Sequence, residues 1–257
     1  MTSGQPRRLN SAELYDIFND GIDDDVALYV TLARDANLTL ELGVGTGRIA
    51  IPLAKSGNRV IGVDYNPTML ERLTVKAQRE RREAQSLITI VHEDFRCLSE
   101  KSGVDLVLYP FCAFNFLLAQ SDGLESLLSL AQAVGPGVKV VFDLLTLNTF
   151  PLMGRMYEET VQWTVPWEGM EIDISMVTEF DQSKQVLHQE RHFSGRDTDS
   201  DVVPQTVIME NRLMMPGEVE LLLEKAHYTI EGVFGDYELN SFRPDSTSLI
   251  VIARTGR

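Results

Sequence analysis

The sequence predicts an α/β fold: a mostly parallel, doubly wound sheet with helices on both faces, and an inserted antiparallel β segment. Apolar, β-branched strands alternate with helical segments up to Asp143, which is typical of a parallel sheet buried on both faces. Between Pro151 and Leu213 the pattern changes to β-type alternation with few helix formers. The 257 residues, 44% of them hydrophobic, suffice for one such domain with an insertion.

The first part of the chain is expected to form two helices, followed by five strands and their crossover helices. Ser11 can cap the first helix, and the acidic residues 23–25 suit the positive end of the second helix. Gly57 can end the helix after the first strand, and Pro67 is tolerated in the first turn of the next one. We expect helices over 11–19, 24–34, 48–55, 66–82 and 122–133, and strands over 38–42, 59–63, 87–91, 105–109 and 139–143.

The insertion is expected to be an antiparallel meander. Its candidate strands are 159–165, 171–180, 186–194 and 206–213, with turn residues at 167–169 and 181–184. A helix at 216–225 and strands at 229–234 and 248–253 close the chain. We therefore divide the chain into a domain of residues 1–150 plus 214–257 and an inserted subdomain of residues 151–213, which we expect to cover the substrate site.

Composition argues against several classes of function. The net charge of −15 opposes nucleic-acid binding, which needs Lys and Arg at phosphates, but suits a cationic small molecule. The chain has no run of 18 apolar residues, so no membrane span is expected, and the polar residues 1–10 lack a signal-peptide core. Cys97 and Cys112 have no metal or redox spacing, which favours the reducing cytoplasm. A homodimer is left open.

A glycine-rich turn, Glu41-Leu42-Gly43-Val44-Gly45-Thr46-Gly47-Arg48, follows the first strand of the sheet and opens a helix. Its spacing is G-x-G-x-G, with Arg48 where the dinucleotide fingerprint has its third glycine, and the Lys-Ser/Thr of a P-loop is absent. Asp64 ends the next strand, where a ribose diol would lie. The turn therefore predicts binding of a small molecule that carries a nucleoside.

The acidic residue before G-x-G-x-G, the acid at the end of strand two, Asp94-Phe95 after strand three and Gly135-Pro136-Gly137 before strand five together resemble the class I S-adenosylmethionine-dependent methyltransferases. The resemblance implies strand order 3-2-1-4-5-7-6, with strand 7 antiparallel, and S-adenosylmethionine as cofactor. The cofactor-binding residues it implies are Tyr15, Tyr29, Glu41, Gly43, Gly45, Gly47, Asp64, Tyr65, Met69, Asp94, Phe95 and Tyr109.

The resemblance implies a specific role for most of these residues. Glu41 and the glycine turn would hold the methionine part, and Asp64 would accept from both ribose hydroxyls. Tyr65 and Met69 would pack on adenine, and Asp94 would accept from its exocyclic amine. The tyrosines 15 and 29 would close over the methionine end.

The segment after strand four, Tyr109-Pro110-Phe111-Cys112, narrows the type of methyltransferase. It lacks the Asp/Asn-Pro-Pro-Tyr/Phe motif of base-modifying enzymes, and Tyr109 cannot replace a carboxylate ligand of Mg²⁺. His188 and His192 lie in a predicted strand without a nearby Cys or motif acid, so no metal site is expected.

What remains resembles small-molecule methyltransferases that tailor natural products, including the sugar-nucleotide N,N-dimethyltransferases. The helix Ala12–Phe18 and the inserted meander carry this resemblance, whereas Asn19 departs from it where an aromatic residue can follow. Phe111, Asn115 and Phe116 follow strand four and are expected to bind the acceptor.

The predicted reaction is methylation of a small polar metabolite, with an amine favoured as acceptor. An amine must be neutral to attack, so Tyr15, Asp143 or His192 would take its proton, although each of these residues has an ordinary structural role as the alternative. The sequence leaves three other functions open: an O-methyltransferase, a non-catalytic cofactor-binding protein, and a nicotinamide oxidoreductase, which Arg48 disfavours.

Overall fold

The computed structural model describes residues 7–19, 21–149, 161–195 and 202–256. These residues form two compact units, and each is described by itself. The smaller unit comprises the described residues of 1–22 and 152–211, and the larger unit comprises those of 23–151 and 212–257. Within the described residues, no helix is long and apolar enough to cross a membrane.

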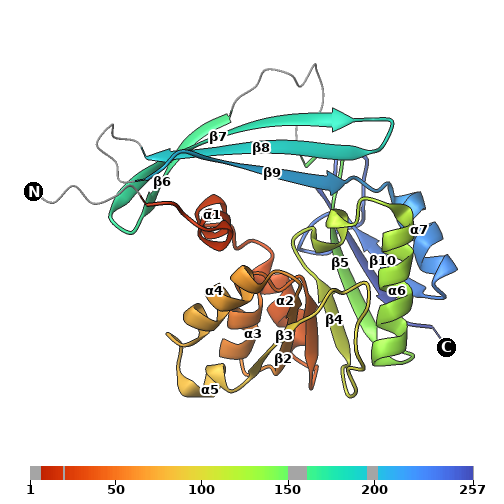
Figure 1. The fold of residues 1–257 in the computed structure, drawn as a ribbon. Coiled ribbons are helices and arrows are strands. Elements are labelled where there is room, and N and C mark those ends of the chain that lie inside the picture. Colours follow the sequence, from red (N-terminus) through yellow and green to blue (C-terminus); the bar gives the residue numbers. More distant parts are fainter. Residues whose placement is uncertain (1–6, 20, 150–160, 196–201, 257) are drawn as a thin grey trace, which may run out of the picture. The chain divides into compact units, whose positions relative to one another are not determined.

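The larger unit is built on a seven-stranded sheet whose order is β10-β11-β5-β4-β1-β2-β3 (Figure 1). Neighbours among β1 to β5 pair in parallel, whereas β11 pairs antiparallel with both β5 and β10. The expected order and the antiparallel last strand are confirmed. The strands are β1 (Thr39–Leu42), β2 (Val60–Asp64), β3 (Ile88–His92), β4 (Leu106–Tyr109), β5 (Lys139–Leu145), β10 (Thr229–Phe234) and β11 (Ser248–Arg254).

Helices cover both faces of this sheet, as the continuous apolar strands predict. One apolar cluster joins Val107 of β4 to Leu130 of α6, and a second joins Leu108 of the same strand to Leu73 of α4. Successive strand residues point to opposite faces, so one short strand contributes to both cores. The helices are α2 (Val26–Ala33), α3 (Ala50–Lys55), α4 (Pro67–Ala77), α5 (Arg82–Gln85), the 3₁₀ turn η1 (Ala113–Phe116), α6 (Gln120–Val134) and α7 (Pro216–Lys225).

Two local predictions were wrong. The helix expected over 66–82 ends at Ala77, and a separate turn of helix follows at Arg82–Gln85. Ala77 is the last buried residue of α4. The helix ends there because the residues that follow have no apolar face to pack against the sheet. Ser11 is also not the cap of the first helix: Asn10 accepts from the N–H groups of Ala12 and Glu13 in a capping box.

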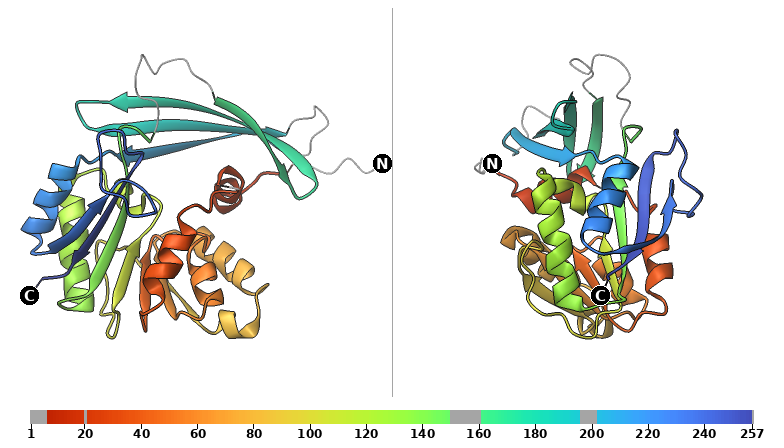
Figure 2. Two further views of the ribbon diagram at one scale, coloured as in Figure 1. Left: turned by 180° about the vertical axis from the view of Figure 1, so that it is seen from behind. Right: turned by 90° about the vertical axis from the view of Figure 1, so that its right-hand side faces the viewer.

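The smaller unit contains a four-stranded sheet of order β6-β7-β8-β9, which confirms the predicted meander. Its strands are β6 (Val161–Trp167), β7 (Met170–Asp181), β8 (Val186–Gly195) and β9 (Gln205–Arg212). Figure 2 shows these long strands from two further sides. The expected turn between β6 and β7 is present, with Glu168 and Gly169 at φ values of 48° and 85°. Such a pair matches the tight turn of a hairpin.

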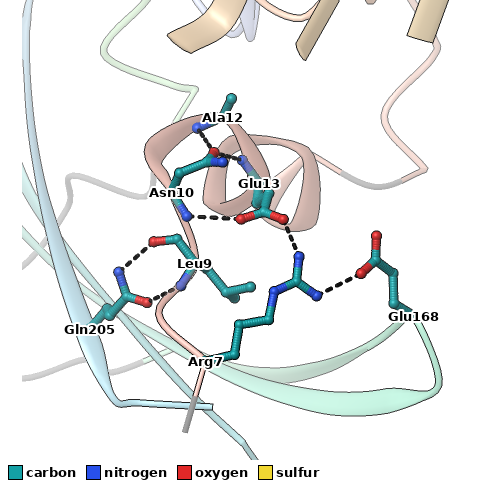
Figure 3. Close-up of polar contacts among 7 residues, drawn as sticks. All are labelled: Arg7, Leu9, Asn10, Ala12, Glu13, Glu168 and Gln205. Atoms are coloured by element: carbon teal, nitrogen blue, oxygen red, sulfur yellow. Dashed lines mark hydrogen bonds and ion pairs between the residues drawn. The ribbon is translucent and has the colours of Figure 1, made fainter. Parts of the chain in front are cut away.

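The N-terminal segment groups with this smaller unit, whereas the sequence places it in the domain of residues 1–150 plus 214–257. That domain division stays a prediction. The Gln205 side chain donates to the Leu9 carbonyl and accepts from the Leu9 N–H, at 2.8 and 2.7 Å (Figure 3). Arg7 bridges Glu13 of helix α1 (Ser11–Phe18) and Glu168 of the β6–β7 turn. An apolar cluster includes Leu9, Leu14 and Ile17 of this segment and Ile172, Ile174 and Phe193 of the sheet. The proposed cover over the substrate stays a prediction.

Candidate functional site

The glycine turn follows β1 in the larger unit, and its geometry requires glycine. Gly43, Gly45 and Gly47 have φ values of 76°, 54° and 86°, a region that L residues with a side chain rarely adopt. A Cβ on Gly47 would lie 2.2 Å from Leu73 Cδ1, and one on Gly43 would lie 2.9 Å from Ala113 Cβ. Gly43 and Gly47 are therefore packed so closely against Ala113 and Leu73 that a side chain at either position would clash.

Asp64 ends β2 and holds the glycine turn from the side. Its carboxylate accepts from the N–H groups of Gly45 and Asn66, both at 2.8 Å, and its side chain is buried. Burial raises the pKa of Asp64, and the backbone donors oppose this shift. A carboxylate offers about four acceptor positions, so it can also accept from a ribose diol. That role stays a prediction.

Glu41 lies in β1 and is 1% exposed. Its Oε2 makes no hydrogen bond within the part of the chain that the structure describes. Burial raises the pKa of Glu41 well above its usual value, and the neighbouring Arg48 opposes that shift. Buried polar atoms normally have partners, so this oxygen indicates a missing donor. The ammonium group of a bound S-adenosylmethionine would supply one, and the residues here fit that cofactor.

Arg48 is fixed next to the turn by an acid that sequence reasoning did not assign to the site. Its two terminal nitrogens donate to the two oxygens of Asp25, each at 2.6 Å, and Asp25 is almost wholly buried. The guanidinium carbon of Arg48 lies 4.2 Å from the ring centre of Phe111. Asp25 had been interpreted only as a dipole partner of helix α2, because no motif links it to a residue so far along the chain.

Asp143 lies near the end of β5, and one of its carboxylate oxygens accepts three hydrogen bonds. Its Oδ2 accepts from the hydroxyls of Tyr29 and Tyr237, at 3.2 and 3.1 Å, and from the N–H of Phe111 at 3.1 Å. Burial, followed by the charge of Asp25, raises the pKa of Asp143 to about 6. Tyr29, expected over the methionine end, thus points its hydroxyl at Asp143. Tyr237 was missed because it lies in the β10–β11 connection without a recognisable pattern.

The residues expected around adenine differ in exposure. Tyr65 is 68% exposed and Met69 is partly exposed, whereas Phe95 is buried. Asp94 accepts from the guanidinium of Arg96, with distances of 2.6 and 3.0 Å to its Oδ2, and these hydrogen bonds hold the pKa of Asp94 below its usual value. Both partners of this ion pair are partly exposed, and such pairs contribute little to stability. The adenine contact of Asp94 stays a prediction.

Two expected site residues belong instead to the packing of the larger unit. Tyr109 is wholly buried, its ring is stacked on Phe142, and its hydroxyl lies 2.8 Å from Ser126 Oγ. Asn115 is also wholly buried: it donates to the Arg212 carbonyl at 2.6 Å and accepts from the Leu145 N–H at 3.1 Å. Backbone groups use both ends of its amide, and its expected contact with the acceptor stays a prediction. Its neighbour Phe116 is 46% exposed.

Tyr15 and His192 lie in the smaller unit, on different sides of its sheet. His192 alternates along β8 with Phe193, which packs in the same cluster as Leu14 of the helix that carries Tyr15. His192 therefore occupies the other face, where its Nδ1 lies 2.9 Å from Thr206 Oγ1 beside a hollow of about 590 Å³. The described residues contain no group of three or more His, Cys, Asp or Glu placed to hold a metal.

Comparison with known proteins agrees with this geometry. Residues 39–137 match a family described as a methyltransferase domain. Over 89 residues the chain is 33% identical to a putative methyltransferase of Geobacillus sp. (strain WCH70), and this match spans 35% of the chain and 34% of that relative.

Solved structures extend the likeness to nearly the whole chain. The CcbJ methyltransferase from Streptomyces caelestis is 24% identical with a TM-score of 0.73, over 91% of this chain and 94% of its own. The sugar N-methyltransferase KedS8 from Streptoalloteichus sp. ATCC 53650 is 17% identical with a TM-score of 0.73, over 100% of this chain and 99% of its own.

These findings confirm the class inferred from the glycine turn. The protein has the fold of the class I S-adenosylmethionine-dependent methyltransferases, and residues 39–137 match a family described as a methyltransferase domain. S-adenosylmethionine is the cofactor of this class, and the buried carboxylates around the turn fit it.

Proposed function

We propose that this protein transfers a methyl group from S-adenosylmethionine to an amine of a small polar metabolite, such as an amino sugar or a related natural-product intermediate. The observation that carries the proposal is the buried Oε2 of Glu41 beside the glycine turn, which has no hydrogen-bond donor among the described residues. Asp25, Asp64 and Asp143 are also buried here, and among the described residues the guanidinium of Arg48 is the one that pairs with this group, at Asp25. Buried carboxylates in excess favour a cationic ligand.

The residues of the larger unit divide the cofactor between them. Glu41 would accept from the ammonium group, and the backbone of the glycine turn would pass beside the methionine chain. Asp64 would accept from the ribose hydroxyls while it keeps its bond to Gly45. Tyr65 and Met69 offer partly exposed apolar surface that adenine would cover.

When bound, S-adenosylmethionine supplies a methyl group that its sulfonium already activates. The protein therefore has to align the acceptor nitrogen in line with the methyl carbon and exclude water from it. The nitrogen lone pair forms the new C–N bond as the C–S bond breaks, and the ammonium product then loses its proton to solvent. The proposal needs no dedicated base. Roles for Tyr15 and His192 with the acceptor stay predictions.

Two observations favour an amine acceptor over a hydroxyl. The chain carries a net charge of −15, which raises the local concentration of cationic metabolites. The fold matches that of a sugar N-methyltransferase over its whole length. We include in the proposal that the smaller unit supplies the cover over the acceptor.

Ligand analysis of the purified protein and calorimetry with S-adenosylhomocysteine test the cofactor. Glu41→Gln should weaken binding by roughly 1.5–3 kcal/mol, the usual value of a hydrogen bond to a charged group. Glu231→Gln is the matched control, because it removes a carboxylate from an exposed pair with Arg254 on β10 and β11. Equal affinity of the Glu41 variant and the control would contradict the role of Glu41, and bound NAD(P) would contradict the proposed function.

A screen of amines, alcohols and carboxylates with labelled cofactor tests the acceptor. An amine acceptor predicts a rate that rises with pH until the bound amine is neutral. Label found only on oxygen, with a rate independent of pH, would replace the amine by a hydroxyl and leave methyl transfer intact.

A further inference from the structure

The connection that follows β4 contains two adjacent residues in the left-handed region. Phe111 and Cys112 have φ values of 48° and 62°, although both carry side chains. Non-glycine residues in this region cost about 1 kcal/mol or more each, so the surrounding structure has to hold them there. We call this pair the 111–112 turn. It lies at the carboxyl end of the parallel strands, where ligands of such sheets bind.

Asp143 holds both amide groups of the 111–112 turn. Its Oδ2 accepts from the N–H of Phe111 at 3.1 Å, and its backbone carbonyl accepts from the N–H of Cys112 at 3.0 Å. The hydroxyls of Tyr29 and Tyr237 donate to the same Oδ2 and fix the carboxylate from two other elements. One buried residue thus determines the backbone path of the turn.

The other side of the 111–112 turn contacts the glycine turn. The guanidinium of Arg48, which directly follows Gly47, stacks on the Phe111 ring at 4.2 Å. Arg48 cannot shift freely, because both of its terminal nitrogens are bound to the buried Asp25. A chain of contacts therefore runs from Asp143 through Phe111 to the end of the glycine turn.

We propose that Asp143 is a positioning residue that fixes the 111–112 turn and, through the ring of Phe111, the glycine turn against the cofactor. This inference rests on the proposed function for the identity of the ligand. It differs from the role of proton acceptor expected from sequence. Three donors already occupy Oδ2, and their number and direction are those of a fixed acceptor in the scaffold.

Two conservative variants separate positioning from charge. Asp143→Asn keeps an acceptor oxygen at the same place and loses the charge, whereas Asp143→Glu keeps the charge and displaces it by one methylene. Thr255→Val is the control: the Thr255 hydroxyl is buried and accepts from the Val138 N–H at the other end of β5, so its loss destabilises the same strand elsewhere. The readouts are amide hydrogen exchange at Phe111 and Cys112 and calorimetric affinity for S-adenosylhomocysteine.

Positioning predicts that Asp143→Asn stays near wild type in both readouts. Asp143→Glu should exchange roughly tenfold faster at the two amides and bind roughly tenfold more weakly, as expected for about 1.4 kcal/mol. Thr255→Val should change neither. With an acceptor identified by the screen, kcat should be lowered in Asp143→Glu and stay near wild type in Asp143→Asn and Thr255→Val.

The opposite result, in which Asp143→Glu stays near wild type and Asp143→Asn is impaired, would overturn the proposal and indicate that Asp143 acts through its charge or as a base. Unchanged exchange at the 111–112 turn in both Asp143 variants would also overturn it. Failure of the wild-type protein to bind S-adenosylhomocysteine would instead contradict the proposed function. The amide exchange data would still test whether Asp143 fixes the 111–112 turn.

Discussion

Substitution of Gly47 by alanine tests whether the glycine turn is as tightly packed as its geometry indicates. An alanine there takes a φ of 86°, which costs about 1 kcal/mol or more. Its Cβ would also lie 2.2 Å from Leu73 Cδ1 and 3.2 Å from Ile51 Cδ1, and overpacking of this kind typically costs about 1–3 kcal/mol. The expected loss in the free energy of unfolding is therefore roughly 2–5 kcal/mol.

Gly57 offers a matched control for the backbone part of this loss. Its φ is 96°, and a Cβ there would meet nothing within 4 Å. Gly57→Ala should therefore lose only the backbone term, about 1–2 kcal/mol. Denaturant unfolding measures both variants, and calorimetry with S-adenosylhomocysteine should show weaker binding for Gly47→Ala alone.

A double-mutant cycle identifies the clashing partner. Leu73→Ala removes the atom nearest to the new Cβ, at the usual cost of about 2–5 kcal/mol for a buried leucine. The double variant should be more stable than additivity predicts, by about 1–3 kcal/mol. Additive losses, or equal losses for Gly47→Ala and Gly57→Ala, would refute the steric reasoning.

Three further predictions concern Asn115 and Asp143 of the larger unit and Ile17 of the smaller one. Asn115→Ala should destabilise the fold by about 2–5 kcal/mol, because it leaves two buried backbone groups without partners. Unchanged stability in denaturant unfolding, together with an altered acceptor KM, would contradict this prediction and support a contact between Asn115 and the acceptor. The pKa of Asp143 is raised from 3.8 to about 6, so the folded state favours the protonated carboxyl. The contribution of this proton to the free energy of unfolding is therefore complete below about pH 4 and is lost as the pH rises through about 6. The free energy of unfolding of wild type should therefore fall relative to Asp143→Asn by up to about 3 kcal/mol across that window, and parallel pH curves for the two proteins would contradict the shift. Ile17→Ala should cost about 2–5 kcal/mol in the smaller unit, measured as faster amide exchange in β7 and β8, whereas unchanged exchange there would show that α1 does not support the sheet.

The sheet could be predicted because each of its strands is recognisable from its own residues, without knowledge of its contacts. Apolar β-branched segments define β1 to β5, and the acids near the carboxyl ends of β1 and β2 lie at one edge because parallel strands point the same way. Glu41 and Asp64 thus came together from spacing alone. The strand order 3-2-1-4-5-7-6 followed from a family resemblance and was confirmed.

The missed residues of the site share a physical cause. Asp25 and Tyr237 reach the site from a helix and a loop that no motif marks, and their roles depend on contacts far along the chain. Asn115 was noticed because it is polar among aromatic residues, but sequence cannot tell whether its partner is a substrate or a backbone. The direction of a side chain after a turn with two left-handed residues is likewise not encoded in periodicity.

The smaller unit is assembled from two stretches that the ribosome makes far apart in time. Helix α1 is finished early, but the strands that cover Leu14 and Ile17 begin only at Val161. At usual rates of synthesis about 140 intervening residues take roughly 10–30 s, during which the larger unit can begin to fold first. The apolar side of α1 remains uncovered for that time, so α1 should be a chaperone-binding segment of the nascent chain until the sheet of the smaller unit emerges.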